Sequence, residues 1–270
     1  MTPPTQRGIQ SIEVGGQVLL AMVHGGRPMA LKDIARESDM AAAKVHPYLV
    51  SFSRIGLIDQ DEATGRYFLG PLALQLGLIG LRQANPVQVA SAAIAELAQR
   101  LGQTVAIAVW GSRGPTIVRL EESPAPVHVN MRHGTVFSLA GTASGRLFGA
   151  YRDANGIKRL LESERRRRRS DPEPVYPGMP PARSVPSWRE FERELIEVRA
   201  HGLGRSEGET VPGVNAMAAP VFDHHGSITL AITAIGPAGT FDVRWDGPVA
   251  RALRACADQV SQRLGAPAAG

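Results

Sequence analysis

The 270-residue sequence has a single cysteine and no hydrophobic run long enough to cross a membrane. Cys256 alone excludes a framework of internal disulfide bonds, and its helical spacing among apolar residues indicates a buried, unreactive thiol. The longest uncharged apolar stretch, residues 68–81, is shorter than the roughly 20 residues that a membrane-spanning helix requires. No charged segment followed by an apolar one opens the chain, so no secretion signal is visible. We therefore expect a soluble, cytoplasmic protein.

The sequence also lacks the short motifs of common enzyme classes. It contains no Gly-x-Ser-x-Gly around a serine, no phosphate-binding Gly-x-x-x-x-Gly-Lys and no Cys-x-x-Cys. The adjacent His224 and His225 fall in an expected turn without the further ligands that a zinc site needs. We expect no enzyme, no metal and no cofactor, and a hydrolase built on a triad of distant residues is the weaker alternative.

Net charge does not locate the functional region. The chain carries a formal charge of +5, but residues 1–83 hold eight basic and seven acidic side chains. The remainder holds the larger excess, and five consecutive arginines at residues 165–169 supply much of it. A basic chain favours a nucleic-acid partner, but the charge excess does not say where the contact is. The pattern of residues has to locate it.

Residues 28–69 have the pattern of a winged helix-turn-helix. The first helix places small or apolar residues at i, i+3, i+4 and i+7: Leu31, Ile34, Ala35 and Ser38. The second helix repeats with the same period: Val45, Leu49, Phe52 and Ile55. Gly56 ends it, and two short strands joined by a turn over 59–65 follow. Helices joined by so short a turn cross steeply, which allows the second to enter a major groove of duplex DNA.

Several polar residues of this region are candidate DNA contacts. They are Lys44, His46, Tyr48, Ser51 and Arg54 on the second helix and Arg66 on the wing. Arginine bridges guanine edges or phosphate oxygens, whereas lysine and serine more often hold the backbone. The alternatives are that some of these positions are only solvated, that Tyr48 is half-buried, and that the winged helix contacts another protein rather than an operator.

The flanking helices carry further expectations. A first helix over 11–23, capped by Ser11, is expected to turn Ile12, Leu19, Met22 and Val23 inward. A helix over 72–83 is apolar all round, so it must be buried, and we expect it to pack against a second subunit. An ordinary interdomain helix in a monomer is the alternative. These features divide the chain into a DNA-binding domain (1–70), a linker helix (71–84) and a second domain (85–270).

The second domain mixes strands and helices without regular alternation, which indicates an α+β fold on an antiparallel sheet. Strands are expected at 104–110, 116–121, 127–131, 214–222 and 227–235. Helices are expected at 86–101, 141–151, 157–161 and 187–201, with a last helix whose apolar stripe is Val249, Leu253, Cys256, Val260 and Leu264. Residues 165–186 are expected to form a loop.

From about Ser11 to Gly265 the chain resembles the IclR family of bacterial transcriptional regulators. The resemblance is carried by LI at 57–58, TGRYFLGP at 64–71, AGTASGR at 140–146, GE at 208–209, GVNAMAAPVFD at 213–223 and IGP at 235–237. It implies a winged helix, a linker helix, a GAF-like effector-binding domain, and a homodimer or homotetramer. It also implies control by a small molecule, often an organic or aromatic acid. The sequence does not distinguish repressor from activator and does not name the effector or the operator.

Two features depart from the family pattern. Ala43, Lys44 and Pro47 stand where the family usually has Ser-Thr and a later arginine. Proline inside a helix costs about 3 kcal/mol, so we expect either a kink at Pro47 or a helix that restarts there. The arginine run at 165–169 has no place in the pattern. We expect a solvated loop, with contact to DNA phosphates or to an acidic partner as the alternative.

The start of the expected helix at 141–151 is the candidate effector site. Residues 141–145 would present backbone amides at a helix N-terminus, which attracts a carboxylate, and Thr142 and Ser144 would add hydroxyl donors. An ordinary capped helix start is the alternative. Matching pocket positions of the family are Ala143, Ser144, Ser206, Asn215 and Ala216, with Met131 and Leu139 above them. Asn215 would orient the acid or, alternatively, only tie strands together.

Overall fold

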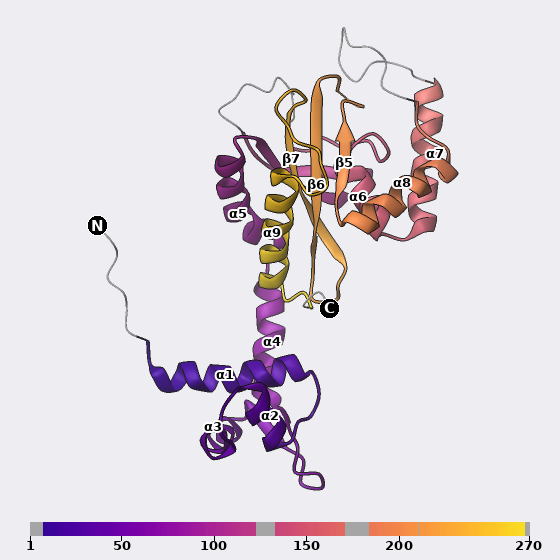
Figure 1. Cartoon of the computed structure of the whole chain (residues 1–270). Coiled ribbons are helices and arrows are strands. Elements are labelled where there is room, and N and C mark those ends of the chain that lie inside the picture. The colour runs from indigo at the N-terminus through magenta and orange to yellow at the C-terminus, as the bar shows by residue number, and fades with distance from the viewer. Residues whose placement is uncertain (1–7, 123–132, 171–183, 210, 268–270) are drawn as a thin grey trace, which may run out of the picture. The chain divides into compact units, whose positions relative to one another are not determined.

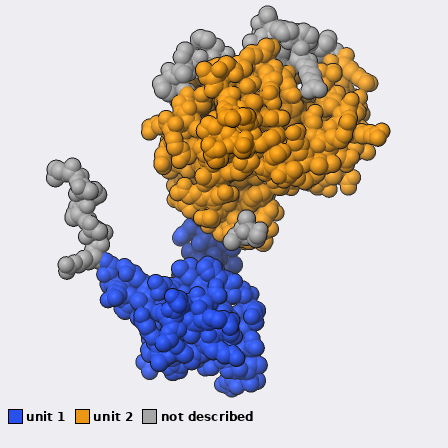
Figure 2. Space-filling view, in the orientation of Figure 1, with its two compact units in different colours: residues 1–83 blue, residues 84–270 orange. Residues whose placement is uncertain are grey.

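The computed structural model describes residues 8–122, 133–170, 184–209 and 211–267. The chain divides into two compact units, residues 1–83 and residues 84–270 (Figure 1 and Figure 2). Within the described ranges, no helix has both the length and the apolar character needed for a bilayer crossing.

Unit 1 (residues 1–83) is built of short helices and a small hairpin. The elements are α1 (Gln10–Gly25), α2 (Leu31–Glu37), α3 (Ala42–Arg54), β1 (Ile58–Gln60), β2 (Tyr67–Leu69) and α4 (Pro71–Gln83). Strands β1 and β2 pair in antiparallel fashion, and Met29 bridges to Tyr67. Val18, Ile34 and Val45, from three different helices, meet in a core from which solvent is excluded. The expected helix, turn, helix and wing are all present.

Helix α1 buries only part of the expected face: Leu19 and Met22 pack in the core of unit 1, whereas Ile12 and Val23 do not. It begins at Gln10, with Ile9 rather than Ser11 at the N-cap and no side-chain cap. Met22 is buried as expected, but Ile12 and Val23 are 70% and 61% exposed. The reason is Gly15: a Cβ there would lie 2.9 Å from Cζ of Phe52, so α1 approaches α3 through its glycine face. Close backbone approach decided the orientation, rather than side-chain size.

Helix α3 is one helix from Ala42 to Arg54 with Pro47 inside it, so the expected restart at Pro47 is wrong. The first turn forms before Pro47, and the helix continues through the proline because Val45 and Leu49 on either side are fully buried. Ile55, expected on the buried face, is 58% exposed because it lies beyond the last turn as the C-cap.

Unit 2 (residues 84–270) contains a five-stranded antiparallel sheet in the order β4-β3-β7-β6-β5. The strands are β3 (Thr104–Gly111), β4 (Gly114–Glu121), β5 (Gly204–Glu207), β6 (Val214–Phe222) and β7 (Ile228–Pro237). One face packs against α5 (Pro86–Leu101) and α9 (Pro248–Arg263), and the other against α6 (Ala143–Tyr151) and α8 (Trp188–His201). This confirms the α+β fold, with β5 as an addition that the sequence did not predict.

Helix α7 (Ala154–Ser170) corrects a second expectation. A single helix replaces the expected short helix over 157–161 and the start of the expected loop, so the arginines at 165–169 are helical. Its inner side is anchored by Ile157 and Leu161, which are fully buried. The expected strand at 127–131 and the rest of the loop, 171–183, lie outside the described residues. The stripe of α9 is buried as predicted.

Candidate DNA interface and effector site

Helix α3 separates an apolar inner side from a polar outer side. Val45 and Leu49 are fully buried, whereas Lys44, His46, Ser51 and Arg54 are exposed. The helical period places Lys44, Ser51 and Arg54 on one stripe. No aspartate or glutamate occurs in α3, so this stripe is positively charged. Four of the five predicted contacts on the helix are therefore exposed, although the Ser51 hydroxyl donates to Pro47 O at 2.9 Å.

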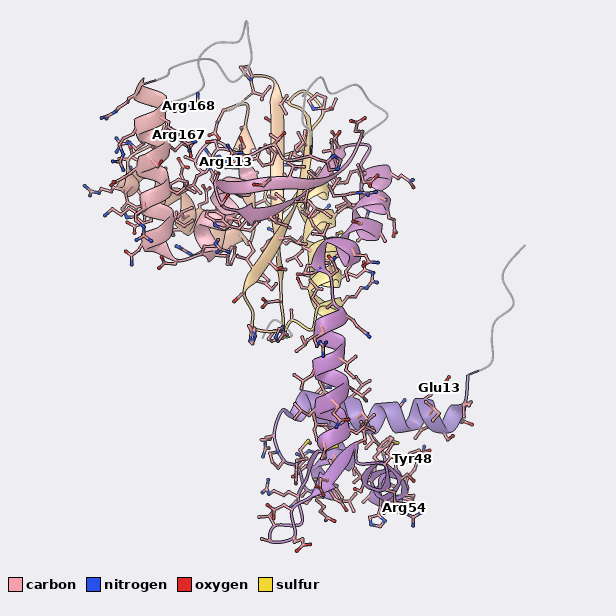
Figure 3. All side chains as sticks on the ribbon, turned by 180° about the vertical axis from the view of Figure 1, so that it is seen from behind. Glu13, Tyr48, Arg54, Arg113, Arg167 and Arg168 are labelled. Carbon is pink, nitrogen blue, oxygen red and sulfur yellow. The ribbon has the colours of Figure 1, made fainter. Side chains whose placement is uncertain are left out.

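Tyr48 occupies the boundary between the two sides of α3. It is half-buried, and its ring lies beside Gly15 of α1, where a Cβ would be 3.3 Å from Tyr48 Cδ1. Figure 3 shows Tyr48 on the side of α3 nearer to α1 and Arg54 farther from it. The half-buried alternative therefore describes Tyr48, whose ring helps to hold α3 against α1.

A sharp turn between α2 and α3 fixes the direction of α3. Asp39 adopts φ 52°, the left-handed conformation that aspartate tolerates better than most residues. The Ser38 hydroxyl donates to Ile34 O at 2.7 Å, and the Met40 amide donates to Ala35 O at 2.9 Å. These bonds close the last turn of α2 and start α3 in a new direction.

The wing is ordered by its own hydrogen bonds. Asp61 Oδ1 accepts from the amides of Ala63 and Thr64 at 2.9 and 2.8 Å, and the Thr64 amide lowers the pKa of Asp61. Arg66 is exposed, and its Nη1 donates to Pro28 O at 3.3 Å. Arg66 thus braces the wing against the segment that precedes α2 while remaining open to solvent.

The N-terminus of α6 is closed by its own side chains. Thr142 is the N-cap: its hydroxyl oxygen accepts from the Gly145 amide at 3.0 Å, and the same hydroxyl donates a hydrogen bond to Ser138 O at 2.8 Å. Ser144, which is 1% exposed, shares a hydrogen bond of 2.8 Å with Thr233 of β7. The predicted hydroxyls are therefore present, with Thr142 acting as a cap and Ser144 facing the sheet.

Strand register decides which predicted residues meet. Ser206 pairs with Ala216, which packs against the same core as α6. Asn215 pairs with Glu207 and Gly236, and alternation along β6 turns its side chain to the other face, where α5 and α9 pack. The structure gathers six of the eight predicted positions near the start of α6: Leu139, Thr142, Ala143, Ser144, Ser206 and Ala216. It sets Asn215 apart, and Met131 lies outside the described residues.

Two buried charged groups at α6, Glu164 and Arg146, were not predicted from the sequence. Glu164 of α7 is 9% exposed, and its carboxylate accepts from the Ser138 hydroxyl and, at 2.9 Å, from the Leu139 amide. Arg146 of α6 is also buried, and pairs with Glu194 at 3.0 Å and with Glu209. Ile157, Leu161 and Glu164 follow the i, i+4, i+7 spacing of one helix face, and this spacing could have predicted that Glu164 faces inward.

Two hollows border Arg146. One of about 170 Å³ lies beside the edge strand β5 and is lined by Arg146, Glu194, Glu197, Val198, Arg205, Ser206, Glu207, Glu209 and Trp245. A smaller one, of about 30 Å³, borders the segment from Ser138 to Gly141. Among the residues that the structure describes, no group of histidine, cysteine, aspartate and glutamate side chains could hold a metal ion.

Comparisons with known proteins agree with this two-part organisation. Residues 11–62 match the IclR helix-turn-helix domain, and residues 80–262 match the bacterial transcriptional regulator IclR C-terminal domain. The sequence is 30% identical over 265 residues to the glycerol operon regulatory protein of Streptomyces griseus, which covers 96% of this chain and 98% of that protein. The protein of the same name in Streptomyces coelicolor is 29% identical over the same shares.

Solved structures extend the likeness to the fold. The crystal structure of Pseudomonas aeruginosa HmgR superposes with a TM-score of 0.84 at 33% sequence identity, covering 97% of this chain and all of that one. The Agobacterium tumefaciens repressor BlcR has a TM-score of 0.78 at 19% identity, which is evidence for the fold alone.

Proposed function

Because the chain belongs to the IclR family of bacterial transcriptional regulators, we propose that α3 and the β1–β2 wing bind operator DNA under the control of a small organic acid bound beside α6. The family establishes a DNA-binding transcriptional regulator with a C-terminal effector domain rather than an enzyme. What remains a proposal is which residues make the contacts and which class of effector is bound.

The observation that carries the DNA contact is the two-sided character of α3. Its buried side fixes the helix in unit 1, and its outer stripe of Lys44, Ser51 and Arg54 has no carboxylate to repel phosphate. A guanidinium such as that of Arg54 can make a bidentate contact with guanine, whereas Lys44 and Ser51 suit the phosphate backbone. The braced wing with Arg66 adds a cation beside the groove.

The decisive experiment compares two exposed arginines of unit 1. Arg54→Ala is expected to weaken operator binding by about 1–3 kcal/mol if Arg54 reads a base, because a bidentate contact is lost. The control is Arg36→Ala on α2, whose guanidinium is 3.2 Å from Asp33. A footprinted upstream fragment and fluorescence anisotropy give both affinities. Equal affinity of Arg54→Ala and wild type removes Arg54 from the interface.

The effector proposal rests on the chemistry around α6. Ser144 and Thr233 place two hydroxyls in an otherwise apolar layer formed by Ala143, Leu147 and Ala218. The N-terminus of α6 is next to them, and although Thr142 accepts from its Gly145 amide, the helix dipole there still favours negative charge. A small acid with an apolar or aromatic body fits this combination, because its body replaces buried apolar contacts and its carboxylate meets the helix end.

A second copy of the chain is part of the proposal. No residue of α4 is buried, and Leu74, Leu76, Leu78, Ile79 and Leu81 are all exposed. An apolar surface of this kind marks an interaction site on an otherwise polar protein. We therefore propose that α4 helices pair in a homodimer, or in the dimers of a tetramer, so that two copies of α3 meet two half-sites.

A further inference from the structure

The outer face of α7 is basic along most of its length. From Lys158 onward, the described exposed residues of α7 are Lys158, Arg159, Glu162, Arg166, Arg167 and Arg169. From Lys158 to Arg169 the face extends about 16 Å, at roughly 1.5 Å per helical residue. Glu162 is one carboxylate among five cations, so this face has an excess of positive charge.

Glu164, the other glutamate of α7, does not lie on the outer face and so does not reduce its positive charge there. Glu164 points inward, where its carboxylate is bound by the Ser138 hydroxyl and the Leu139 amide. A carboxylate held by two donors on the inner side is a poor partner for guanidinium groups on the opposite side. Of the two glutamates of α7, only Glu162 therefore lies on the outer face with the five cations.

The hairpin between β3 and β4 extends the same surface. A Cβ at Gly114 would lie 3.4 Å from Leu160 Cδ2, so the hairpin turn is in contact with α7. Arg113, the residue before it, is exposed. Figure 3 shows Arg113 near the half of α7 that carries Arg167 and Arg168.

Helix stability does not account for so many cations. Basic residues near a helix C-terminus interact with the helix dipole for about 0.3–1 kcal/mol each, and the effect is confined to the last turn. That reason applies to Arg167 and Arg169. It does not apply to Lys158 and Arg159, which lie in the first two turns of α7.

We propose that this α7 face binds the phosphate backbone of duplex DNA, as a second, sequence-independent contact in addition to α3. The inference deepens the proposed function and rests on it, since α3 would bring duplex DNA to the protein. Guanidinium groups bind phosphate oxygens in a bidentate geometry, and most cations of this face are arginines. Duplex DNA carries about one negative charge per 1.7 Å of axis, so a 16 Å face meets several phosphates.

Two double variants of the full chain test the inference. Arg159→Gln with Arg169→Gln removes two exposed cations from α7. Arg100→Gln with Arg263→Gln removes two exposed cations from α5 and α9 and is the matched control. The probe is an 80-base-pair duplex of random sequence, and its affinity is measured by fluorescence anisotropy over a series of KCl concentrations. Thermal melting checks that all variants fold like the wild type.

Each lost phosphate contact lowers the slope of log affinity against log salt by about 0.9. The α7 variant is therefore expected to lose nearly two from the slope and about tenfold or more in affinity at 100 mM KCl, whereas the control keeps the wild-type slope. Glu162→Gln, which removes a carboxylate from the same face, is expected to strengthen binding. This gain cannot come from misfolding.

The outcomes are separable. A wild-type chain that binds no duplex contradicts the proposed function itself. A wild type that binds, with equal slopes for both double variants, overturns only the α7 inference. If the α7 variant keeps the duplex slope but loses binding to polyglutamate, the face recognises an acidic protein and the inference is likewise overturned.

Discussion

The two units differ in what they leave exposed. Among the described residues, 13 large hydrophobic side chains are exposed, and 12 of them lie in unit 1, which is less than a third of the chain. Ile196 is the one in unit 2. Unit 2 covers both faces of its sheet with its own helices, whereas unit 1 leaves α4 and the outer side of α1 bare. This difference is the one expected if unit 2 buries its apolar residues within itself and unit 1 buries them against the second copy proposed above.

The largest effect is expected from a charge on α4. Leu78→Glu places a carboxylate in the proposed subunit contact and should convert the oligomer to monomers, as measured by sedimentation equilibrium. Two half-sites bound together gain about 10²–10⁴ over one, so operator affinity should fall by at least about a hundredfold. Ile196→Glu makes the same change on the exposed apolar residue of unit 2. If both variants keep the wild-type mass, the contrast between the units has another cause.

A negative charge at Ser144 in unit 2 should abolish binding of the proposed effector. Ser144→Asp puts a second carboxylate where the acid is expected, so calorimetry with a panel of small carboxylic acids should detect no binding. Ser144→Ala, which keeps the site neutral, separates repulsion from lost packing. Ser51→Asp, on the exposed face of α3, should leave effector binding intact and weaken operator binding instead. Equal acid affinity in Ser144→Asp and wild type would place the effector elsewhere.

A methyl group added at a glycine should lower the free energy of unfolding in unit 2 and raise it in unit 1. In Gly204→Ala the new Cβ would lie 2.2 Å from the backbone oxygen of Ala143, so α6 must shift from the sheet. Overpacking of this kind costs about 1–3 kcal/mol. In Gly16→Ala of α1 the Cβ meets open space, and the helix gains up to about 1 kcal/mol. Denaturant unfolding monitored by circular dichroism measures both, and a neutral Gly204→Ala would contradict the tight α6–β5 contact.

The smallest effect concerns the thiol of unit 2. Burial raises the pKa of Cys256 from 9.0 to about 11. Below pH 9 the thiol is protonated in the folded and unfolded chains alike, so its contribution is fully present. As the pH rises towards 11, the unfolded thiol ionises first and stability falls. Cys256→Ala should lack this part of the pH dependence in urea unfolding. Rapid reaction of native Cys256 with a thiol reagent at pH 8 would show that it is not enclosed.

The sequence predicted elements best where a helix has one apolar side and one partner. The stripe of α9 from Val249 to Leu264 is such a case, and its period alone located it. The outward face of α1 could not be found in this way, because Gly15 adds nothing to a hydrophobic pattern although it allows α1 to lie close to Phe52 of α3. Strand β5 is four residues long and contains arginine and glutamate, so it resembles a loop.

For the candidate sites too, the sequence predicted what helical period determines and missed what depends on packing between distant segments. The exposure of the candidate contacts on α3 was predictable because helical period and polarity agree at Lys44 and Arg54. Around α6, family positions named the residues without saying which face of β6 each one occupies. Strand alternation excludes Asn215 and Ala216 from a shared site. The inward turn of Glu164 depends on packing between α7 and the start of α6, which are distant in sequence.

Glu164 gives α7 and the start of α6 a common mechanical link. A ligand that tilts the outer side of α7 would act, through the Glu164 carboxylate, on the Ser138–Leu139 segment that leads into α6. If binding at α7 changes the affinity of α6 for an acid, thermodynamic reciprocity requires that the acid change the affinity of α7 for a polyanion by the same factor. Through this one side chain, the proposed acid and the proposed DNA contact of α7 would change each other's affinity within unit 2.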